Sequence, residues 1–335
     1  MNLNFEGGST VSISNLIQKW SGINETSKIL IIVDDIQKSI ADSIKEEKIY
    51  EVQIEYFSKN DALFSLLKSM KSSDLVMVLL SIDTYMKSGA NEYFSALKKP
   101  DWLIAKYIFV RLDISKESLI QGLSTDKELV YDKIEEMNSL NSDAIITVTS
   151  ESGTNISFRV NPFTTCSHEI ITDGGFAFLP PSETSADVIT DTANGKIVID
   201  MTVGQLYHFG ELIGYFGLVS EPIMLIVKDG IIADIYGDNM ATEFKDKLFG
   251  LPIECRKLVE LGQGLSKMEP TGLIGVDESI IDSCHFGFGD GWKCGTHLDL
   301  VIKNPIIKHY EAGEVIHGKI NKRSGRNTNG TIWQG

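Results

Sequence analysis

Buried-looking strands that alternate with helices fill the first 150 residues and constrain the fold more than any other feature. Residues 28–34 are apolar from Ile29 to Val33 and end in Asp34, which is typical of a strand covered on both faces. Such strands occur in parallel sheets, where helices cover the two faces. The same reasoning predicts further strands at residues 50–57, 74–81, 106–113 and 143–149, and helices at residues 10–22, 36–48, 60–70 and 126–140. This alternation predicts a doubly wound, largely parallel α/β domain over residues 1–150.

The pattern changes after residue 150 to short strands of alternating polarity separated by glycine turns. Asp229-Gly230 predicts a tight hairpin turn, because aspartate and glycine tolerate the positive φ angles that such a turn requires. Strands are predicted at residues 155–160, 175–179, 195–203, 222–228 and 231–236, with a helix at residues 239–249. The second part, residues 151–335, is therefore predicted to be a β-rich α+β domain.

Composition excludes several classes of protein. The chain has 46 acidic and 31 basic residues among 335, which argues against nucleic acid as a partner. No apolar segment is long enough to span a membrane, and the N-terminus lacks the basic and apolar run of a signal peptide. The four cysteines, Cys166, Cys255, Cys284 and Cys294, are too dispersed for a disulfide framework. We expect a cytoplasmic protein that binds no membrane.

The first strand does not lead into a nucleotide-binding turn. It ends in Asp34 and Asp35, with no glycine-rich or lysine-containing phosphate loop. Two carboxylates at that turn would repel a phosphate. The first domain is therefore predicted to be a scaffold or a wall of the substrate site rather than a nucleotide-binding domain.

Residues 284–300 carry the chemistry that is most suggestive of a metal site. His297 and Asp299 are two apart, so on a strand they project from one face while the intervening leucine faces the core. His285 adds a second imidazole from the preceding strand, and imidazole with carboxylate suits a divalent metal. An ordinary surface pair is the alternative. A thiolate site is disfavoured, since Cys284 should face away from His285.

The order of several segments resembles the leucyl aminopeptidase S/T-type metallo-aminopeptidase superfamily, which includes 2,5-dihydroxypyridine 5,6-dioxygenase. The resemblance covers most of the second half and, more faintly, the first. The matching segments are residues 152–158, 175–181, 193–200, 227–230, 260–264, 276–279, 285–289 and 297–299.

The resemblance implies metal ligands at Glu260, His285, His297 and Asp299. In the aminopeptidases two metals share the glutamate that matches Glu260. Their first metal-binding glutamate matches Phe176, and their tyrosine ligand has no match in the shortened segment that holds Trp292. The dioxygenase binds one iron through two histidines and one aspartate. For this chain the resemblance therefore implies one divalent ion (Zn, Mn, Co or Fe(II)). It also implies a homodimer, because members of the family usually dimerise.

Other candidates lie around this set. Glu183 follows two prolines and is a candidate general base or displaced metal ligand, and His168 is a candidate proton shuttle. Ordinary solvent-exposed roles remain open for both. Residues predicted to line a substrate pocket are Phe176, Lys267, Phe288 and Trp292.

Three functions remain open at this level. The first is a metal-dependent hydrolase with a specialised peptide or amide substrate, in which the metal activates a water. The second is a mononuclear non-haem Fe(II) dioxygenase that acts on a small aromatic molecule. The third is a member of the same fold that binds a peptide without catalysis. The hydrolase is favoured narrowly, because Glu260 and His285 match the aminopeptidases.

Overall fold

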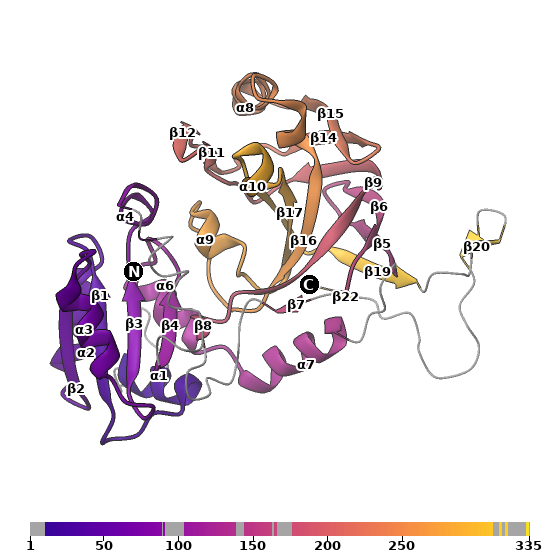
Figure 1. Ribbon diagram of the computed structural model, residues 1–335. Helices are drawn as coiled ribbons and strands as arrows, with labels where there is room; N and C mark the ends of the chain where they lie inside the picture. The colour runs from indigo at the N-terminus through magenta and orange to yellow at the C-terminus, as the bar shows by residue number, and fades with distance from the viewer. Residues whose placement is uncertain are drawn as a thin grey trace. The chain divides into compact units, whose positions relative to one another are not determined.

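The computed structural model describes residues 11–88, 90, 104–138, 144–162, 164–165, 176–310, 315–316, 319–320 and 333–334 (Figure 1). The chain forms two compact units. The first unit comprises Met1–Thr125 and His168–Pro180, and the second comprises Asp126–Ser167 and Pro181–Gly335. The boundary expected near residue 150 lies inside the second unit. His168 lies outside the described residues, so its predicted role stays a prediction.

The first unit is built on a parallel sheet, as the sequence predicts. Its strand order is β2-β1-β3-β4-β8 and every neighbouring pair is parallel. The strands are β1 (Lys28–Val33), β2 (Glu51–Tyr56), β3 (Leu75–Leu79), β4 (Lys106–Val110) and β8 (Phe176–Leu179). The accompanying helices are α1 (Ile13–Ser21), α2 (Lys38–Glu46), α3 (Asp61–Ser69), α4 (Ile82–Lys87) and α6 (Lys116–Leu123). Strand β3 is buried along its whole length, which explains its unbroken apolar sequence.

The last strand of this sheet is not the predicted one. Residues 143–149 were expected to join it, but β5 (Ala144–Thr149) pairs antiparallel with β6 (Asn155–Val160) in the second unit. Strand β8, expected in the second domain, pairs with β4 instead. The burial of β5 alternates along the strand, as it does in a sheet with one face against the core. Such a strand suits an antiparallel sheet better than a doubly covered parallel one.

The second unit contains a large, mainly antiparallel sheet in the order β13-β10-β18-β17-β16-β9-β6-β5-β19-β22, with β14 and β7 pairing to β9 and β15 pairing to β14. Its longest strand is β9 (Glu183–Ile199). Its other strands, besides β5 and β6, are β7 (Thr164–Thr165), β10 (Thr202–Val203), β13 (Gly217–Leu218), β14 (Ile223–Lys228), β15 (Ile231–Tyr236), β16 (Leu258–Gly264), β17 (Ser283–Phe288), β18 (Leu298–Lys303), β19 (Ile306–Tyr310) and β22 (Trp333–Gln334). Two separate two-stranded sheets are formed by β11 (Leu206–His208) with β12 (Glu211–Gly214) and by β20 (Val315–Ile316) with β21 (Lys319–Ile320). The mixed α/β architecture is therefore confirmed.

Helices of the second unit are α7 (Lys127–Asn138), α8 (Asn239–Phe249), α9 (Ile274–Asp277) and α10 (Gly291–Cys294), with a 3-10 turn η1 at Ile253–Arg256. Helix α8 matches the predicted segment, and Asp238 caps its first turn by accepting a hydrogen bond from the Ala241 N–H. Within the described part of the chain, no helix has both the length and the apolar character that crossing a bilayer demands.

The predicted hairpin turn is confirmed between β14 and β15. Asp229 and Gly230 have φ angles of 48° and 75°, the positive values that a tight hairpin of this kind requires. A side chain at Gly230 would meet the Thr190 carbonyl oxygen at 2.0 Å, so close packing against β9 also requires glycine here.

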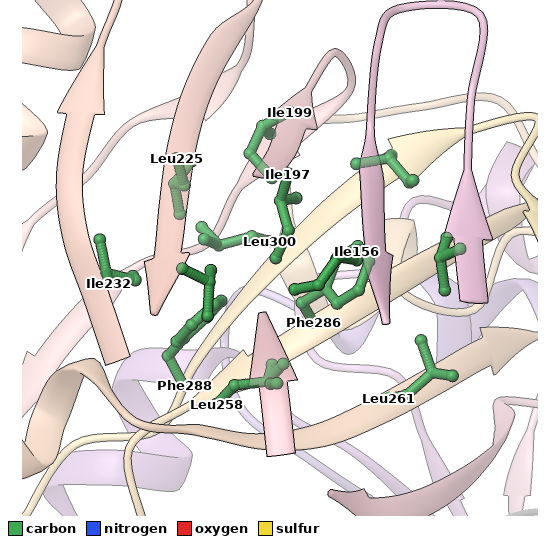
Figure 2. Packing of buried hydrophobic residues seen from close by; sticks show 14 of the residues in the cluster. Ile156, Ile197, Ile199, Leu225, Ile232, Leu258, Leu261, Phe286, Phe288 and Leu300 are labelled. Atoms are coloured by element: carbon green, nitrogen blue, oxygen red, sulfur yellow. The ribbon is translucent and has the colours of Figure 1, made fainter. Parts of the chain in front are cut away.

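The core of the second unit lies on one face of the large sheet. Phe286 and Phe288 of β17 and Leu300 of β18 pack there with Ile197 and Leu225 (Figure 2). All five are fully buried. Burying each such side chain contributes about 1.5–3 kcal/mol, so this face fixes the register of the strands. Because side chains alternate along a strand, the intervening residues of β17 and β18 project from the other face.

Candidate metal centre

Four neighbouring strands, β9, β16, β17 and β18, present charged side chains on the face opposite the core. Glu260 of β16 is paired with Gly287 of β17, which is in turn paired with Asp299 of β18. His285 is two residues before Gly287, and Glu183 of β9 is paired with Gly264 of β16. Directly paired residues of antiparallel strands project to the same side. The register therefore gathers Glu183, Glu260, His285 and Asp299 on one surface.

Two glycines leave the room for these side chains. A Cβ at Gly262 would lie 2.2 Å from both Cε1 and Nε2 of His285, so the imidazole covers this glycine. A Cβ at Gly287 would lie 2.8 Å from the Glu260 Cβ and 3.0 Å from the His297 Cε1. Gly262 and Gly287 thus each face a large polar side chain, whereas Gly264 of β16 is required by the close approach of the Ile280 backbone.

A β-bulge in β16 precedes Glu260. The pairing shifts by one residue between Leu258 and Glu260, so Val259 is an extra residue opposite β17. Bulges bend a strand and change the direction of the side chains that follow. This bulge lets Leu258 pack in the core while Glu260 faces the charged surface.

The charged groups approach within ion-pair distance. His285 Nε2 lies 2.7 Å from Glu183 Oε2, and His297 Nε2 lies 3.2 Å from both Glu260 Oε2 and Asp299 Oδ1. Two groups of potential ligands result, in each of which the ligand atoms lie within 4.8 Å of one another. The first is Glu183, Glu260 and His285, and the second is Glu260, His297 and Asp299. Glu260 belongs to both groups.

The carboxylates hold both imidazoles in the protonated form while no metal competes. Burial lowers the pKa of His285, but the adjacent Glu183 carboxylate outweighs burial and raises that pKa to about 9. The Asp299 carboxylate raises the pKa of His297 well above its usual value, against the effect of burial. Burial raises the pKa of Glu260, but the hydrogen bond from His297 and the imidazole charges lower it overall.

The atoms of the cluster fit a metal ion. Asp299 Oδ1 is buried and makes no hydrogen bond within the described residues, although His297 Nε2 is at ion-pair distance. His297 Nδ1 lies 3.1 Å from the Gly289 carbonyl oxygen, so an N–H there would leave Nε2 directed at the cluster. This is the usual way in which a metal-binding imidazole is oriented. Imidazole and carboxylate donors suit Zn²⁺, Mn²⁺, Co²⁺ or Fe²⁺.

The structure brings the four predicted ligands together, and it places Glu183, the candidate general base or displaced metal ligand, beside His285. Their role as metal ligands stays a prediction, as does the catalytic role considered for Glu183. The resemblance matches the first metal-binding glutamate of the aminopeptidases to Phe176. In this chain Glu183 supplies a carboxylate beside His285 instead. Phe176 lies in β8 of the first unit, and the structure describes only its backbone.

The residues predicted to line a substrate pocket lie in different environments. Phe288 is fully buried in the core, on the face of β17 opposite His285, so its placement in a substrate pocket is corrected. Lys267 is exposed in the loop after β16, and Trp292 lies in α10 with its side chain outside the described part. Their pocket roles stay predictions. A hollow of about 340 Å³ is instead lined by Asp187, Val259, Glu260, Gly289, Asp290, Gly291 and His297.

Sequence reasoning missed Asp187. It lies on β9 directly opposite Glu260, four residues after Glu183 on the same face. The spacing Glu183-x-Ser185-x-Asp187 has the period of two that marks one face of a strand, and this signal could have identified it.

Comparison with known proteins supports the fold. No protein-family model and no curated protein matches the chain. The chain is similar in structure to 2,5-dihydroxypyridine dioxygenase from Pseudomonas putida KT2440, with a TM-score of 0.56 and 16% identity over 94% of this chain and 99% of that chain. It is also similar to wild-type AmpT from Thermus thermophilus, with a TM-score of 0.53 and 11% identity over 89% and 94% of the two chains. At these identities the likeness shows a shared fold, to which the cluster adds a candidate metal site.

Proposed function

We propose that this chain is a metal-dependent hydrolase that cleaves a peptide or amide bond and holds two divalent cations. The observation that carries the proposal is the pair of ligand groups that share Glu260. Glu183 and His285 complete one group, and His297 and Asp299 complete the other. Divalent cations bound in this way supply Lewis acidity to a substrate carbonyl and lower the pKa of a coordinated water.

The charge of the cluster supports two cations instead of one. A single metal was expected because Phe176 was matched to a carboxylate ligand of the aminopeptidases. Glu183 supports a different count, since it brings the carboxylates of the cluster to three, with Glu260 and Asp299. Three negative charges offset most of the charge of two dications, which lie about 3.5–4 Å apart in co-catalytic sites.

The chain's own residues have distinct parts in this proposal. The Gly289 carbonyl orients His297, and the buried position of His285 keeps its imidazole away from bulk water. The hollow beside Glu260 and His297 is the place where a substrate would lie against the cluster. Gly289 and Gly291 line the hollow without side chains and so leave space for the substrate.

A second candidate is a mononuclear Fe(II) dioxygenase, which the likeness to a solved dioxygenase favours. Such iron sites usually combine two imidazoles and one carboxylate at a single metal. In this chain the two imidazoles belong to different ligand groups, each with two carboxylates. That distribution favours the hydrolase. A metal-free peptide-binding protein remains the third alternative.

The test is to titrate metal-free protein anaerobically with Zn²⁺, Mn²⁺, Co²⁺ and Fe²⁺, and to count the bound ions per chain. We expect two ions, together with hydrolysis of amino-acid anilides. Oxygen uptake with a dihydroxylated aromatic ring and one bound iron would establish the dioxygenase instead. No bound ion at all would leave only the peptide-binding alternative.

The expected homodimer and cytoplasmic location remain predictions. Light scattering at working concentrations tests the dimer directly, and a monomer there would refute it.

A further inference from the structure

The hollow beside the metal centre has an unequal distribution of charge. Asp187, Glu260 and Asp290 contribute three carboxylates to its lining, and His297 is the one basic residue among the described residues that line it. The volume of about 340 Å³ is at the small end of ligand pockets, which span roughly 300–1,000 Å³. The hollow therefore suits a small, positively charged group.

Two of the three carboxylates already have a cationic partner. Asp290 Oδ2 lies 2.7 Å from the Lys293 ammonium, and Glu260 Oε2 lies 3.2 Å from His297 Nε2. Asp187 differs, because within the described residues its exposed carboxylate takes part in no hydrogen bond or ion pair. Its backbone is fixed, since its carbonyl oxygen accepts a hydrogen bond from the Asn161 N–H at 2.9 Å. Asp187 therefore has a fixed backbone and presents to the hollow a carboxylate that has no cationic partner among the described residues.

Asp187 places a second carboxylate beside Glu260. Asp187 and Glu260 are paired directly across β9 and β16 and project to the same side. Like charges in this arrangement destabilise a sheet. Asp187 is not a member of either ligand group, so it would coordinate neither proposed metal and its carboxylate remains available to a ligand in the hollow. A cationic group in the hollow would find its partner in this carboxylate.

We propose that Asp187 is a specificity-determining residue that selects a substrate with a cationic side chain, an ammonium or guanidinium, next to the bond that is cleaved. The inference rests on the proposed function, because the hollow adjoins the proposed metal ligands. The net charge of −15 assists it, since the field of an acidic protein attracts cationic ligands.

Binding of L-lysine and L-norleucine to the metal-loaded protein, measured by calorimetry, tests the proposal without requiring turnover. The two amino acids share the α-amino and carboxylate groups and differ in the side-chain ammonium. We expect the wild-type protein to prefer lysine, and Asp187→Asn to reduce that preference about tenfold. Asp187→Glu should keep most of the preference because it keeps the charge.

Asp191→Asn is the matched control, since Asp191 is an exposed carboxylate on the same strand that does not line the hollow. It should leave the lysine preference unchanged. Equal weakening of lysine and norleucine by Asp187→Asn would overturn the proposal, because Asp187 would then recognise the α-ammonium or only support the fold. Absence of any lysine preference in the wild-type protein would also overturn it.

The test of Asp187 and the test of the proposed hydrolase can give opposite results. Lysine selectivity that depends on Asp187, without hydrolysis of any anilide, would support the inference and refute the hydrolase. Hydrolysis of lysine and norleucine anilides at equal rates by wild-type and Asp187→Asn proteins would do the reverse.

Discussion

The imidazole of His285 lies over Gly262 of the neighbouring strand, so closely that a Cβ at Gly262 would be 2.2 Å from its Nε2. The same Cβ would be 2.7 Å from Glu183 Oε2. One glycine therefore makes room for the contact between the two side chains that form the first half of the candidate metal centre. Only glycine leaves enough space at this position of β16 for the His285 and Glu183 side chains.

Gly262→Ala should displace His285 and impair the first ligand group. We expect a loss of about 1–3 kcal/mol in the free energy of unfolding, as is usual when a packed site is overfilled. Denaturant unfolding and metal counting measure the two effects. Gly291→Ala is the control, because a Cβ there would meet only the His297 Cβ, at an ordinary 3.6 Å. Full metal binding by Gly262→Ala would contradict the proposed site.

Glu183→Gln should lower the number of bound divalent ions from two to one per chain. The amide keeps the size of the side chain but removes the charge beside His285. Asp299→Asn should do the same for the second group. Metal analysis after dialysis measures both. Asp187→Asn, a nearby carboxylate outside both groups, should retain two ions. A single ion in the wild-type protein would refute this count.

The stability of the metal-free protein should fall as the pH rises from about 6.5 to about 9. The pKa of His285 is raised from 6.5 to about 9 in the folded state, so the protonated form is stabilised by folding. This contribution is fully present below the unfolded pKa and is lost as the pH passes the folded one. Thermal unfolding with a chelator, from pH 6 to 9, measures it. Constant or rising stability over this range would contradict the ion pair with Glu183.

Metal affinity should change in the opposite direction. A metal has to displace the proton from each imidazole, so binding should tighten as the pH rises through the same range. Zn²⁺ calorimetry in two buffers of different ionisation enthalpy would detect the released protons. Binding without proton release would show that His285 and His297 are not ligands.

Phe288→Ala should destabilise the second unit without changing metal count or substrate preference. Phe288 is fully buried among Leu258, Phe286 and Leu298 in the core cluster, and truncating a core phenylalanine costs about 3–5 kcal/mol. Denaturant unfolding measures the loss, and metal analysis of the folded fraction provides the second measurement. Altered lysine preference would return Phe288 to the substrate pocket.

Much of the fold follows from local sequence signals. The apolar segments at β1, β3 and β4 predict buried strands, because only a sheet covered on both faces buries such a segment completely. Helix α8 and the turn at Asp229-Gly230 are likewise encoded locally, by a capping aspartate and by residues that accept positive φ. These elements depend little on distant parts of the chain.

Which sheet a strand joins was not predictable in the same way. Strands β5 and β8 exchange the sheets expected for them, since pairing depends on partners far away in the sequence. Of the metal-centre residues, His297 and Asp299 could be paired from their spacing alone. Glu183 was a candidate from the sequence, and the spacing on its strand could have pointed to Asp187. The contact of Glu183 with His285 and the place of Asp187 opposite Glu260 follow only from the register of β9 against β16.

The sequence alone therefore determined the types of element, their approximate bounds and one local pair of potential ligands. The tertiary structure decided that Phe288 faces the core, that Gly262 lies under His285, and that Glu183 completes a second ligand group. The physical reason is that periodicity fixes which side chains share a face of one strand. Only long-range pairing between strands fixes which faces meet and which charges become neighbours.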